Sequence, residues 1–351
     1  TEFTSELRAL IDSCWIPGIE YGESFAKMLT SIIGKFGLIL LCPLDERLKR
    51  LAAPVYVDAI KKSDEIVASL QQRSRELVDD GYHAQVLVAD DYFPLFYQAR
   101  DRTRHALKKT SSGTYRTKGI DREFTLDELT VLAENEPQRF SPSVVLRSVV
   151  QDYLLPTVCY FGGAAEIAYF AQSGEVYRVL DRPVTTIFHR QSFTVIESKH
   201  AKTLERFGLK LADLFKGEDG IMPDIVEKHL ASETAAVFAD VEEKINIQLH
   251  LLEKSLFETD QTLGENSVRR RQKILYHIGA MRKKFHKAQL RIDETVNRQI
   301  ESAFASLLPH KHLQERTLNV SGILNKFGPF AIDWIYDSID LDDKGHRILY
   351  F

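Results

Sequence analysis

The sequence is poor in cysteine, and the cysteines that it has follow no structural pattern. The three cysteines, Cys14, Cys42 and Cys159, lie far apart and are odd in number, so they predict neither a disulfide framework nor a Cys-x-x-Cys zinc site. No apolar run approaches the roughly 18 residues that a membrane span needs, and the first residues show no charged-then-apolar signal. These absences predict a protein of the reducing cytoplasm with no membrane partner.

Familiar catalytic and phosphate-binding motifs are also missing. The sequence contains no Gly-x-x-x-x-Gly-Lys-[Ser/Thr], Gly-x-Gly-x-x-Gly, His-Glu-x-x-His or Gly-x-Ser-x-Gly motif, which excludes the commonest nucleotide-loop, zinc-protease and hydrolase signatures. His310 and His312 are too close and too isolated to form a metal site, so no metal is predicted from protein ligands. The formal net charge of −4 argues against a globally basic nucleic-acid binder.

The chain does contain enough apolar material for a large core. Hydrophobic residues make up 44% of its 351 residues, and this length allows roughly two domains. Ser111–Gly113 predicts a hairpin turn, and Thr125 with Glu128 forms a capping box that opens a short helix. Apolar periodicity predicts a buried strand at residues 36–42, a helix over 45–79 and a second strand at 82–88.

The middle of the chain alternates strands and helices. The predicted elements are a helix over residues 141–155, a strand at 157–161, a helix over 164–180 and a strand at 184–188. Ser141 and Pro142 supply the N-cap and first-turn proline of the first helix, and Gly162 and Gly163 separate the first strand from the next helix. This alternation predicts an α/β fold with a parallel, doubly wound sheet.

A long helical hairpin is predicted after about residue 223. Gly264–Ser267 predicts the turn and the new N-cap between its two helices. Apolar residues recur at the three- and four-residue spacing of a coiled coil, namely Phe238, Ile245, Leu249, Leu252, Leu256 and Leu263 in the first helix and Ile278, Met281, Phe285, Ala288 and Ile292 in the second.

The charges of the two helices are opposite. Ten acidic and three basic residues lie between Asp224 and Glu265, and ten basic and two acidic residues lie between Asn266 and Gln299. This distribution favours an antiparallel pair whose charges fix partner and register. A nucleic-acid stripe through Arg269–Arg271 is the alternative, but the acidic helix alongside disfavours it, and no nucleic-acid partner is expected.

The predicted organisation has three parts. They are an α/β core over residues 1–223 with an inserted α/β segment around 82–135, a coiled-coil hairpin over 224–308, and a C-terminal segment over 309–351 that returns to the core. The last strand, at residues 346–351, is expected to join the edge of the core sheet.

The turn at Gly162 and Gly163 is the best candidate for a ligand site. Glycines at the carboxyl end of a parallel strand let a ligand approach the backbone, and the helix N-terminus that follows favours anions. A tight turn alone also needs glycine. Glu166, in the first turn of the helix, either faces the ligand or complements the helix dipole.

Two further pairs of polar residues are candidates for binding. Arg147 and Gln151 share one face of their helix. They are expected either to bind a carboxylate or phosphate or to tie the helix to the sheet. Arg190 and Ser192 follow a strand of the sheet. They are expected either to contact a phosphate or carboxylate or simply to form a solvated strand end.

These residues lie in motifs that resemble a known family. Residues 135–197 are similar to the bacillithiol-biosynthesis cysteine ligase (BshC) family in Arg139-Phe-Ser-Pro142, Val149-Val-Gln-Asp-Tyr-Leu-Leu-Pro156 and Gly162-Gly163-x-x-Glu166-Ile-Ala-Tyr169. Other segments resemble the family in the same order along the chain, namely Gly37-Leu-Ile-Leu, Leu48-Lys-Arg-Leu-Ala-Ala-Pro54, Leu313-Gln-Glu-Arg316 and Leu324-Asn-Lys-Phe-Gly-Pro329.

The resemblance implies a Rossmann-like core related to class I aminoacyl-tRNA synthetases, with inserted elements and a dimerising coiled-coil arm. It implies a ligase that joins cysteine to glucosaminyl-malate through an amide, with ATP or ADP as nucleotide by analogy. Gly162, Gly163 and Glu166 would line the crevice, and Arg190 and Ser192 would take the place of a phosphate-binding loop. Family members are longer at the front, so this chain is expected to lack their N-terminal part and to be inactive alone.

Two functional hypotheses follow. The first is a cytoplasmic, homodimeric ligase that acts on cysteine and glucosaminyl-malate. The alternative is a coiled-coil-dimerising protein that binds a nucleotide or another ligand without ligase activity. Neither hypothesis assigns a catalytic residue from the sequence alone.

Overall fold

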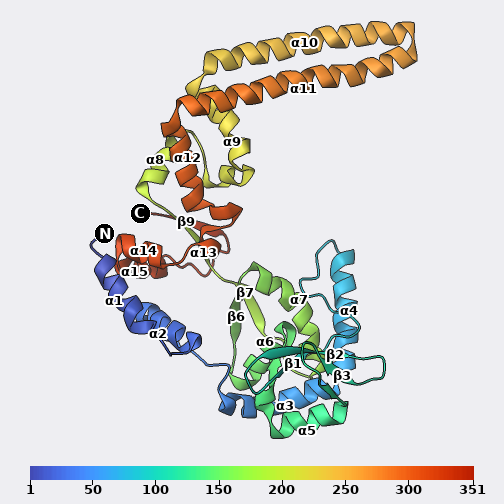
Figure 1. The fold of residues 1–351 in the computed structure, drawn as a ribbon, viewed down its shortest axis with the longest axis vertical. Helices are drawn as coiled ribbons and strands as arrows, with labels where there is room; N and C mark the ends of the chain where they lie inside the picture. Colours follow the sequence, from blue (N-terminus) through green and yellow to red (C-terminus); the bar gives the residue numbers. More distant parts are fainter. The chain divides into compact units, whose positions relative to one another are not determined.

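The computed structural model describes residues 1–351, apart from the side chains of Leu290 and Ile292. The chain divides into two compact units (Figure 1): a body unit, Arg8–Arg190, and an arm unit, Thr1–Leu7 with Gln191–Phe351. The sequence predicted a core that continues to residue 223. The structure ends it earlier because the apolar residues of 196–225 are buried against residues of 296–308 in a core of their own.

The body unit surrounds a core to which helices and strands both contribute. Its helices are α2 (Tyr21–Ile33), α3 (Glu46–Lys61), α4 (Ser63–Asp79), α5 (Leu126–Asn135), α6 (Val144–Leu154) and α7 (Ala164–Val179), and α1 (Thr4–Cys14) leads into it. The single helix predicted over 45–79 is two helices that meet at Lys62. Ile60 and Ile66, on either side of this junction, are both fully buried.

Two predicted strands do not form. Residues 37–44 have no regular secondary structure, and Ile39 is 88% exposed, because no described strand pairs with this apolar run. Residues 82–88 also form a loop. The buried amide of Gln172 takes the place of a neighbouring strand there: its Oε1 accepts from the N–H of Val86 at 2.8 Å, and its Nε2 donates to the Val86 carbonyl at 2.9 Å.

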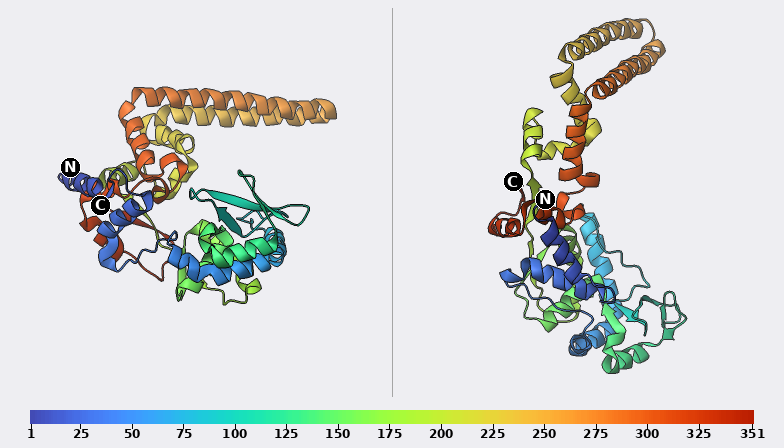
Figure 2. Two further views of the ribbon diagram at one scale, coloured as in Figure 1. Left: turned by 60° about the horizontal axis from the view of Figure 1, so that its bottom comes forward. Right: turned by 60° about the vertical axis from the view of Figure 1, so that its left-hand side comes forward.

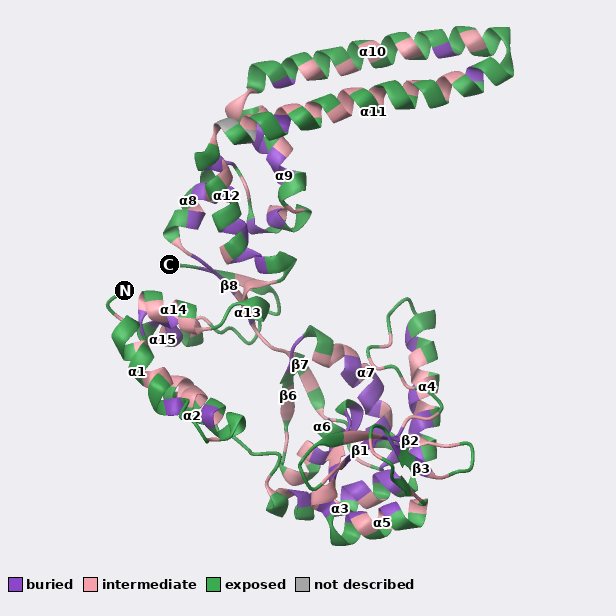
Figure 3. Cartoon of the chain, viewed as in Figure 1, coloured by how far each residue is buried: buried purple, intermediate pink, exposed green. Residues whose placement is uncertain are grey.

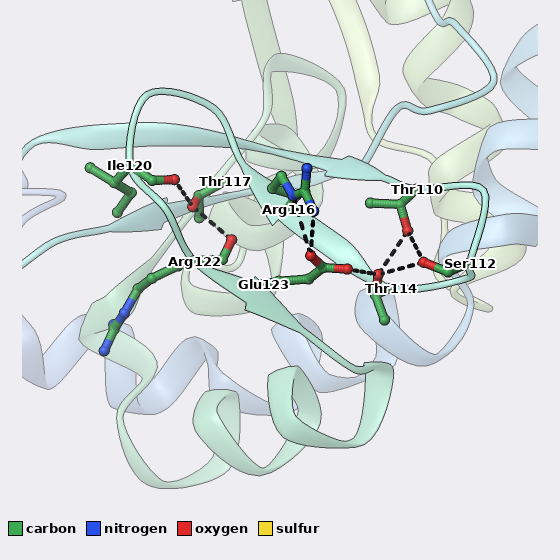
Figure 4. A network of polar contacts seen from close by, with 8 residues as sticks. All are labelled: Thr110, Ser112, Thr114, Arg116, Thr117, Ile120, Arg122 and Glu123. Atoms are coloured by element: carbon green, nitrogen blue, oxygen red, sulfur yellow. Dashed lines mark hydrogen bonds and ion pairs between the residues drawn. The ribbon is translucent and has the colours of Figure 1, made fainter.

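An antiparallel sheet forms the inserted segment, in the order β4-β3-β2-β1-β5. Its strands are β1 (Leu95–Gln98), β2 (Arg104–Lys109), β3 (Tyr115–Thr117), β4 (Glu123–Phe124) and β5 (Phe140–Pro142). The predicted hairpin is confirmed as β2–β3, with Gly113 at a φ of +83° in its turn. Figure 4 shows how Glu123 accepts from Thr114 and from Nη2 of Arg116, the latter at 2.7 Å, which ties β4 to the hairpin.

A parallel pair of strands carries the candidate site. β6 (Cys159–Gly162) and β7 (Thr186–His189) are parallel and connected through α7. The predicted strand–helix–strand unit is therefore confirmed. The capping box of Thr125 and Glu128 is also present at the start of α5, whereas α6 begins later than predicted, with Ser143 rather than Ser141 as its N-cap.

The arm unit has a small parallel sheet of its own. β8 (Ser192–Ile196) pairs with β9 (His346–Tyr350). The prediction that the C-terminal strand joins the edge of the core sheet is therefore wrong. The Gln314 side chain accepts from the N–H of Val195 at 2.9 Å and donates to its carbonyl at 3.0 Å, which extends the edge of β8. The remaining elements near this sheet are α8 (Ser198–Arg206), α9 (Glu218–Ile225), α12 (Glu294–Leu307), α13 (Gln314–Thr317), α14 (Ser321–Phe327) and α15 (Phe330–Asp337).

The predicted hairpin is confirmed as α10 (Ser232–Thr259) and α11 (Gln261–Ile292), which run side by side in both views of Figure 2. Phe238 and Phe285 meet in the seam, with ring centroids 5.5 Å apart. In the described part of the chain, no helix is both long and apolar enough to cross a membrane.

Several predicted seam residues lie elsewhere. Leu252, Leu263, Met281 and Ala288 are exposed, and the side chain of Ile292 lies outside the described residues. Glu253 occupies the seam next to Leu252 because Nε of Arg271, on α11, donates to it at 2.9 Å. The turn is at Asp260, not at Gly264–Ser267: Asp260 accepts from the N–H of Leu263 at 2.9 Å.

A group of charged side chains holds the base of the arm, and we call it the root clamp. Glu227, in a short π-helix (Val226–Leu230), accepts from Nε and Nη2 of Arg282 at 2.7 and 2.8 Å and contacts Nε2 of His286 at 2.7 Å. Nη1 of Arg282 donates to Glu242 at 2.7 Å. The clamp therefore joins α10 and α11 to the end of α9.

Acid is expected to weaken the root clamp. Burial alone raises the pKa of Glu227, but Arg282 and His286 hold it below its ordinary value. A lowered folded-state pKa stabilises the protein above the unfolded pKa, and this stabilisation is lost as pH falls through the folded pKa. Glu227→Gln should therefore cost about 1–3 kcal/mol at pH 7 and less near pH 3. Urea unfolding at both pH values checks this, with the exposed Glu243→Gln as control; an equal pH dependence in both variants contradicts it.

Candidate functional site

The turn between β6 and α7 is the centre of the candidate site. Gly162 lies opposite His189 on the neighbouring strand, and the N–H of Arg190 donates to the Gly162 carbonyl at 2.9 Å. Parallel strands end at the same edge of a sheet. The Gly162–Gly163 turn and Arg190 are therefore neighbours.

Glu166 lies in the first turn of α7, and both its carboxylate oxygens are engaged. Oε2 accepts from the N–H of Gly163 at 2.7 Å, and Oε1 accepts from the Tyr160 hydroxyl at 2.8 Å. Burial raises the pKa of Glu166, but these donors and the charges of Arg147 and Arg190 bring it below its ordinary value. Glu166 is thus an ionised cap that fixes the turn, and it is not poised to act as a general base.

Two tyrosines link Arg147 to this turn. Nη2 of Arg147 donates to the hydroxyl of Tyr160 at 3.1 Å and to that of Tyr169 at 3.3 Å. Burial and the bond to Glu166 raise the pKa of Tyr160 to about 12, against the opposing effect of Arg147. Tyr160 therefore stays protonated at neutral pH and donates to Glu166 while it accepts from Arg147.

Sequence reasoning missed both tyrosines because aromatic residues within a strand or a helix resemble core residues. A signal was available: strand alternation places Tyr160 on the same face as Gly162, and Tyr169 follows Glu166 by three residues on a helix. The structure brings Arg147, Gly162, Gly163, Glu166 and Arg190 to one region of the body unit.

The other two candidate residues have different settings. Gln151 lies one turn beyond Arg147 on α6 and is partly exposed. Ser192 belongs to the arm unit, where it begins β8 instead of a loop, and it is buried. Its Oγ lies 2.7 Å from Nδ1 of His346, so this hydroxyl is engaged between β8 and β9.

The site is suited to an oxyanion. Arg147 has hydroxyl partners but no carboxylate partner in the described part of the chain, and the N-terminus of α7 adds a favourable dipole. Guanidinium groups bind carboxylates and phosphates through paired hydrogen bonds. Among the described residues, no group of three or more His, Cys, Asp or Glu could hold a metal ion.

Gly162 leaves little room for a side chain. A Cβ there would lie 3.2 Å from Cβ of Glu166 and 3.3 Å from Cε1 of Tyr160. Gly162→Ala should therefore destabilise the body unit by about 1–2 kcal/mol in urea unfolding. Gly174→Ala is the matched control, because its Cβ would meet nothing within 4 Å and helix propensity favours alanine by about 1 kcal/mol. Equal stabilities of the two variants would contradict the tight turn.

The fold is that of a Rossmann-like body followed along the chain by a coiled-coil arm. Comparison with protein families agrees: residues 1–191 match the family model "Bacillithiol biosynthesis BshC, N-terminal Rossmann-like domain", and residues 193–351 match "Bacillithiol biosynthesis BshC, C-terminal coiled-coil domain". The chain therefore belongs to the BshC family of bacillithiol biosynthesis, as the sequence motifs indicated. The α/β fold with a coiled-coil hairpin is confirmed.

Curated relatives cover nearly the whole chain. Proteins named "Putative cysteine ligase BshC" are 31% identical over 349 residues in Salinibacter ruber and 33% identical over 351 residues in Solibacter usitatus. These matches cover 99% of this chain, 63% of the first relative and 65% of the second. The chain thus spans less than two thirds of the length of these relatives.

Proposed function

We propose that this chain provides the Rossmann-like and arm portions of a ligase that joins the cysteine carboxylate to the amino group of glucosaminyl-malate. The observation that carries this proposal is the gathering of Arg147, Glu166 and Arg190 around the Gly162–Gly163 turn. Family membership and the names of the relatives support the reaction type. The two cations suit the carboxylates and phosphates that such a reaction handles.

Amide formation needs an activated carboxylate, and ATP is the proposed source of activation. In this scheme cysteine is adenylated with loss of diphosphate, and the amine then displaces AMP. Arg190 contacts the phosphate or carboxylate, Arg147 with Gln151 orients it, and Glu166 holds the turn through Gly163 and Tyr160. Ser192 is also proposed to contact the phosphate or carboxylate.

A chimera tests the proposed function in the context of a longer chain. This chain would replace the segment of the Salinibacter ruber relative that it matches, and mass spectrometry would follow the product from cysteine, glucosaminyl-malate and ATP. We expect the amide product together with AMP. The unmodified relative, assayed in parallel, is the active control. A folded chimera that binds these compounds but forms no amide would contradict the ligase proposal and favour ligand binding alone.

The arm is proposed to bind a second copy of the chain in the cytoplasm. Figure 3 shows how much of α10 and α11 is exposed, and the exposed residues include several apolar ones, namely Ile247, Leu251, Leu252, Ile274 and Tyr276. Exposed apolar side chains on a helical hairpin are available to pack against a partner. An exposed free thiol, Cys42, fits a reducing compartment.

A further inference from the structure

A polar cavity lies between α8 and α12 of the arm unit. The two helices pack against each other (Figure 1), and each contributes apolar residues, such as Leu204 and Ile300, to the core of this unit. Beside that contact they leave a cavity of about 410 Å³, lined by Lys199, His200, Thr203, Thr295, Arg298, Gln299 and Ser302. Every lining side chain is polar and none is acidic, so the cavity suits a polar ligand that is not a cation.

His200 is the most deeply buried residue of this lining. It is 2% exposed, and no hydrogen bond joins its ring to another described residue. Its ring nitrogens are not among the fully enclosed polar atoms that lack a partner, because the residue lines the cavity. Buried polar groups are normally hydrogen-bonded, so the ring nitrogens are open to a ligand in the cavity.

Hydrogen-bond donors face this cavity from both helices. Burial and the charge of Lys199 lower the pKa of His200, while Glu197 opposes them, so the imidazole is neutral at pH 7 and donates one hydrogen bond. Oε1 of Gln299 accepts from Nη1 of Arg206 at 3.1 Å, and Nε2 of this amide has no partner in the described part of the chain. Both donors suit the acceptor oxygens of a ligand.

Two cations line the cavity, one on each helix. Nζ of Lys199 lies 3.4 Å from the carboxylate of Glu197, which also contacts Lys326. Nη2 of Arg298 lies 3.8 Å from the carboxylate of Glu294, and both of these side chains are exposed. A tight charge-assisted hydrogen bond measures about 2.7–2.9 Å, and exposed ion pairs contribute little. Neither cation is therefore held tightly by a carboxylate, and both remain available to an anion.

Positive charge continues beyond the cavity. Arg298 also lines a neighbouring cavity of about 530 Å³, together with Lys287, Arg291, Glu294 and Asn297. Its lining therefore includes three cations and one carboxylate. Cations gathered in this way attract anions to the surface from which the cavity between α8 and α12 is entered.

We propose that the cavity between α8 and α12 binds an oxyanion, a phosphate or carboxylate group, between Lys199 and Arg298, with hydrogen bonds from His200 and Gln299. A guanidinium supplies charge-assisted hydrogen bonds to such a group, and an ammonium on the opposite wall adds a second positive charge. The buried ring of His200 distinguishes this cavity from an ordinary solvated groove. The site uses only residues of the arm unit and none of the turn after β6, so it does not depend on the proposed function.

The test is hydrogen exchange of the 351-residue chain during titration with inorganic phosphate and, separately, malonate at constant ionic strength. A ligand that binds only the folded state suppresses opening of the segments that it contacts, so at least one of these anions should slow exchange in α8 and α12. A stronger effect of phosphate assigns a phosphate group to the ligand, and a stronger effect of malonate assigns a carboxylate. Arg298→Gln should weaken the affinity about tenfold.

A second variant tests the buried ring. His200→Phe keeps a ring and removes both nitrogens, so we expect the affinity to fall about three- to tenfold. Without a ligand, its midpoint of urea unfolding should be unchanged or higher, because a buried polar group that lacks a partner is lost. Arg298→Gln changes an exposed residue and so decides the question if His200→Phe does not fold.

Matched controls separate this site from general charge and from the turn after β6. Lys202→Gln removes one positive charge from an exposed position of α8 outside the cavity and should leave the affinity unchanged. Arg190→Ala alters the turn and should leave the protection of α8 and α12 in place. If neither anion slows exchange there, or if Arg298→Gln binds as well as Lys202→Gln so that the anion is an adventitious ion only, the proposal is overturned.

Discussion

Arg190→Ala is expected to lower kcat/KM for bacillithiol formation about 100-fold. Arg190 follows β7 beside the Gly162–Gly163 turn, and its charge helps to lower the pKa of Glu166. A guanidinium that contacts a developing or bound oxyanion contributes several charge-assisted hydrogen bonds, and removal of one such group typically costs about 2.7–4 kcal/mol. The assay uses the Salinibacter chimera with cysteine, glucosaminyl-malate and ATP.

The matched control is Arg178→Ala. Arg178 lies on α7, is exposed and pairs with Glu175, so its loss should leave kcat/KM within about twofold, as expected for an exposed ion pair. Arg190→Lys, which keeps the charge but loses the planar fork, should fall between the two. If Arg190→Ala keeps the activity of Arg178→Ala, Arg190 does not contact the reacting groups.

Shortening the arm is expected to convert dimers into monomers. The variant replaces residues 247–276 by a short Gly-Ser loop and so removes the outer part of both helices with its exposed apolar residues. The root clamp of Glu227, Glu242 and Arg282 is kept, and α12 stays in the core of the arm unit. Sedimentation should therefore show a folded monomer, because the proposed interface is gone while both cores remain.

A point variant provides an independent check of the interface. Leu252→Glu places a charge on the exposed side of α10, where Leu252 is 54% exposed, and should weaken the dimer because a desolvated, unpaired charge is costly. Lys254→Glu, also exposed on α10, serves as control for the added charge. Dimers that persist in the shortened arm would assign the interface to another surface.

Local signals were the most predictive part of the sequence. The capping box at Thr125, the hairpin turn at Gly113 and the strand–glycine–helix unit at Gly162 each depend on a few neighbouring residues, and all three are present. The two strands that failed depend on a partner that the sequence does not show. Gln172 bonds to Val86 in place of a strand, and no rule of periodicity identifies such a side chain.

In the arm, too, periodicity did not identify contacts between side chains of different elements. The heptad pattern predicted the hairpin correctly. Apolar spacing, however, selected Leu252 as a seam residue, whereas Glu253 lies in the seam because it accepts a hydrogen bond from Arg271. At the candidate site, Arg190 was selected by its position after a strand, Glu166 by its place in the first turn of the next helix, and Arg147 by the helix face that it shares with Gln151. The roles of Tyr160 and Tyr169 come from their hydroxyl contacts with Arg147, which are long-range in the sequence.

Hydrogen exchange tests the central claim most directly. The claim is that the turn of β6 into α7, with Arg147 and Arg190, holds the oxyanion of a substrate. In the chimera, addition of ATP, cysteine and glucosaminyl-malate should slow exchange of the backbone N–H groups of residues 163–166, and the Arg147→Ala, Arg190→Ala double variant should lose this protection. Protection that appears only elsewhere in the chain, or that survives in the double variant, would contradict the claim.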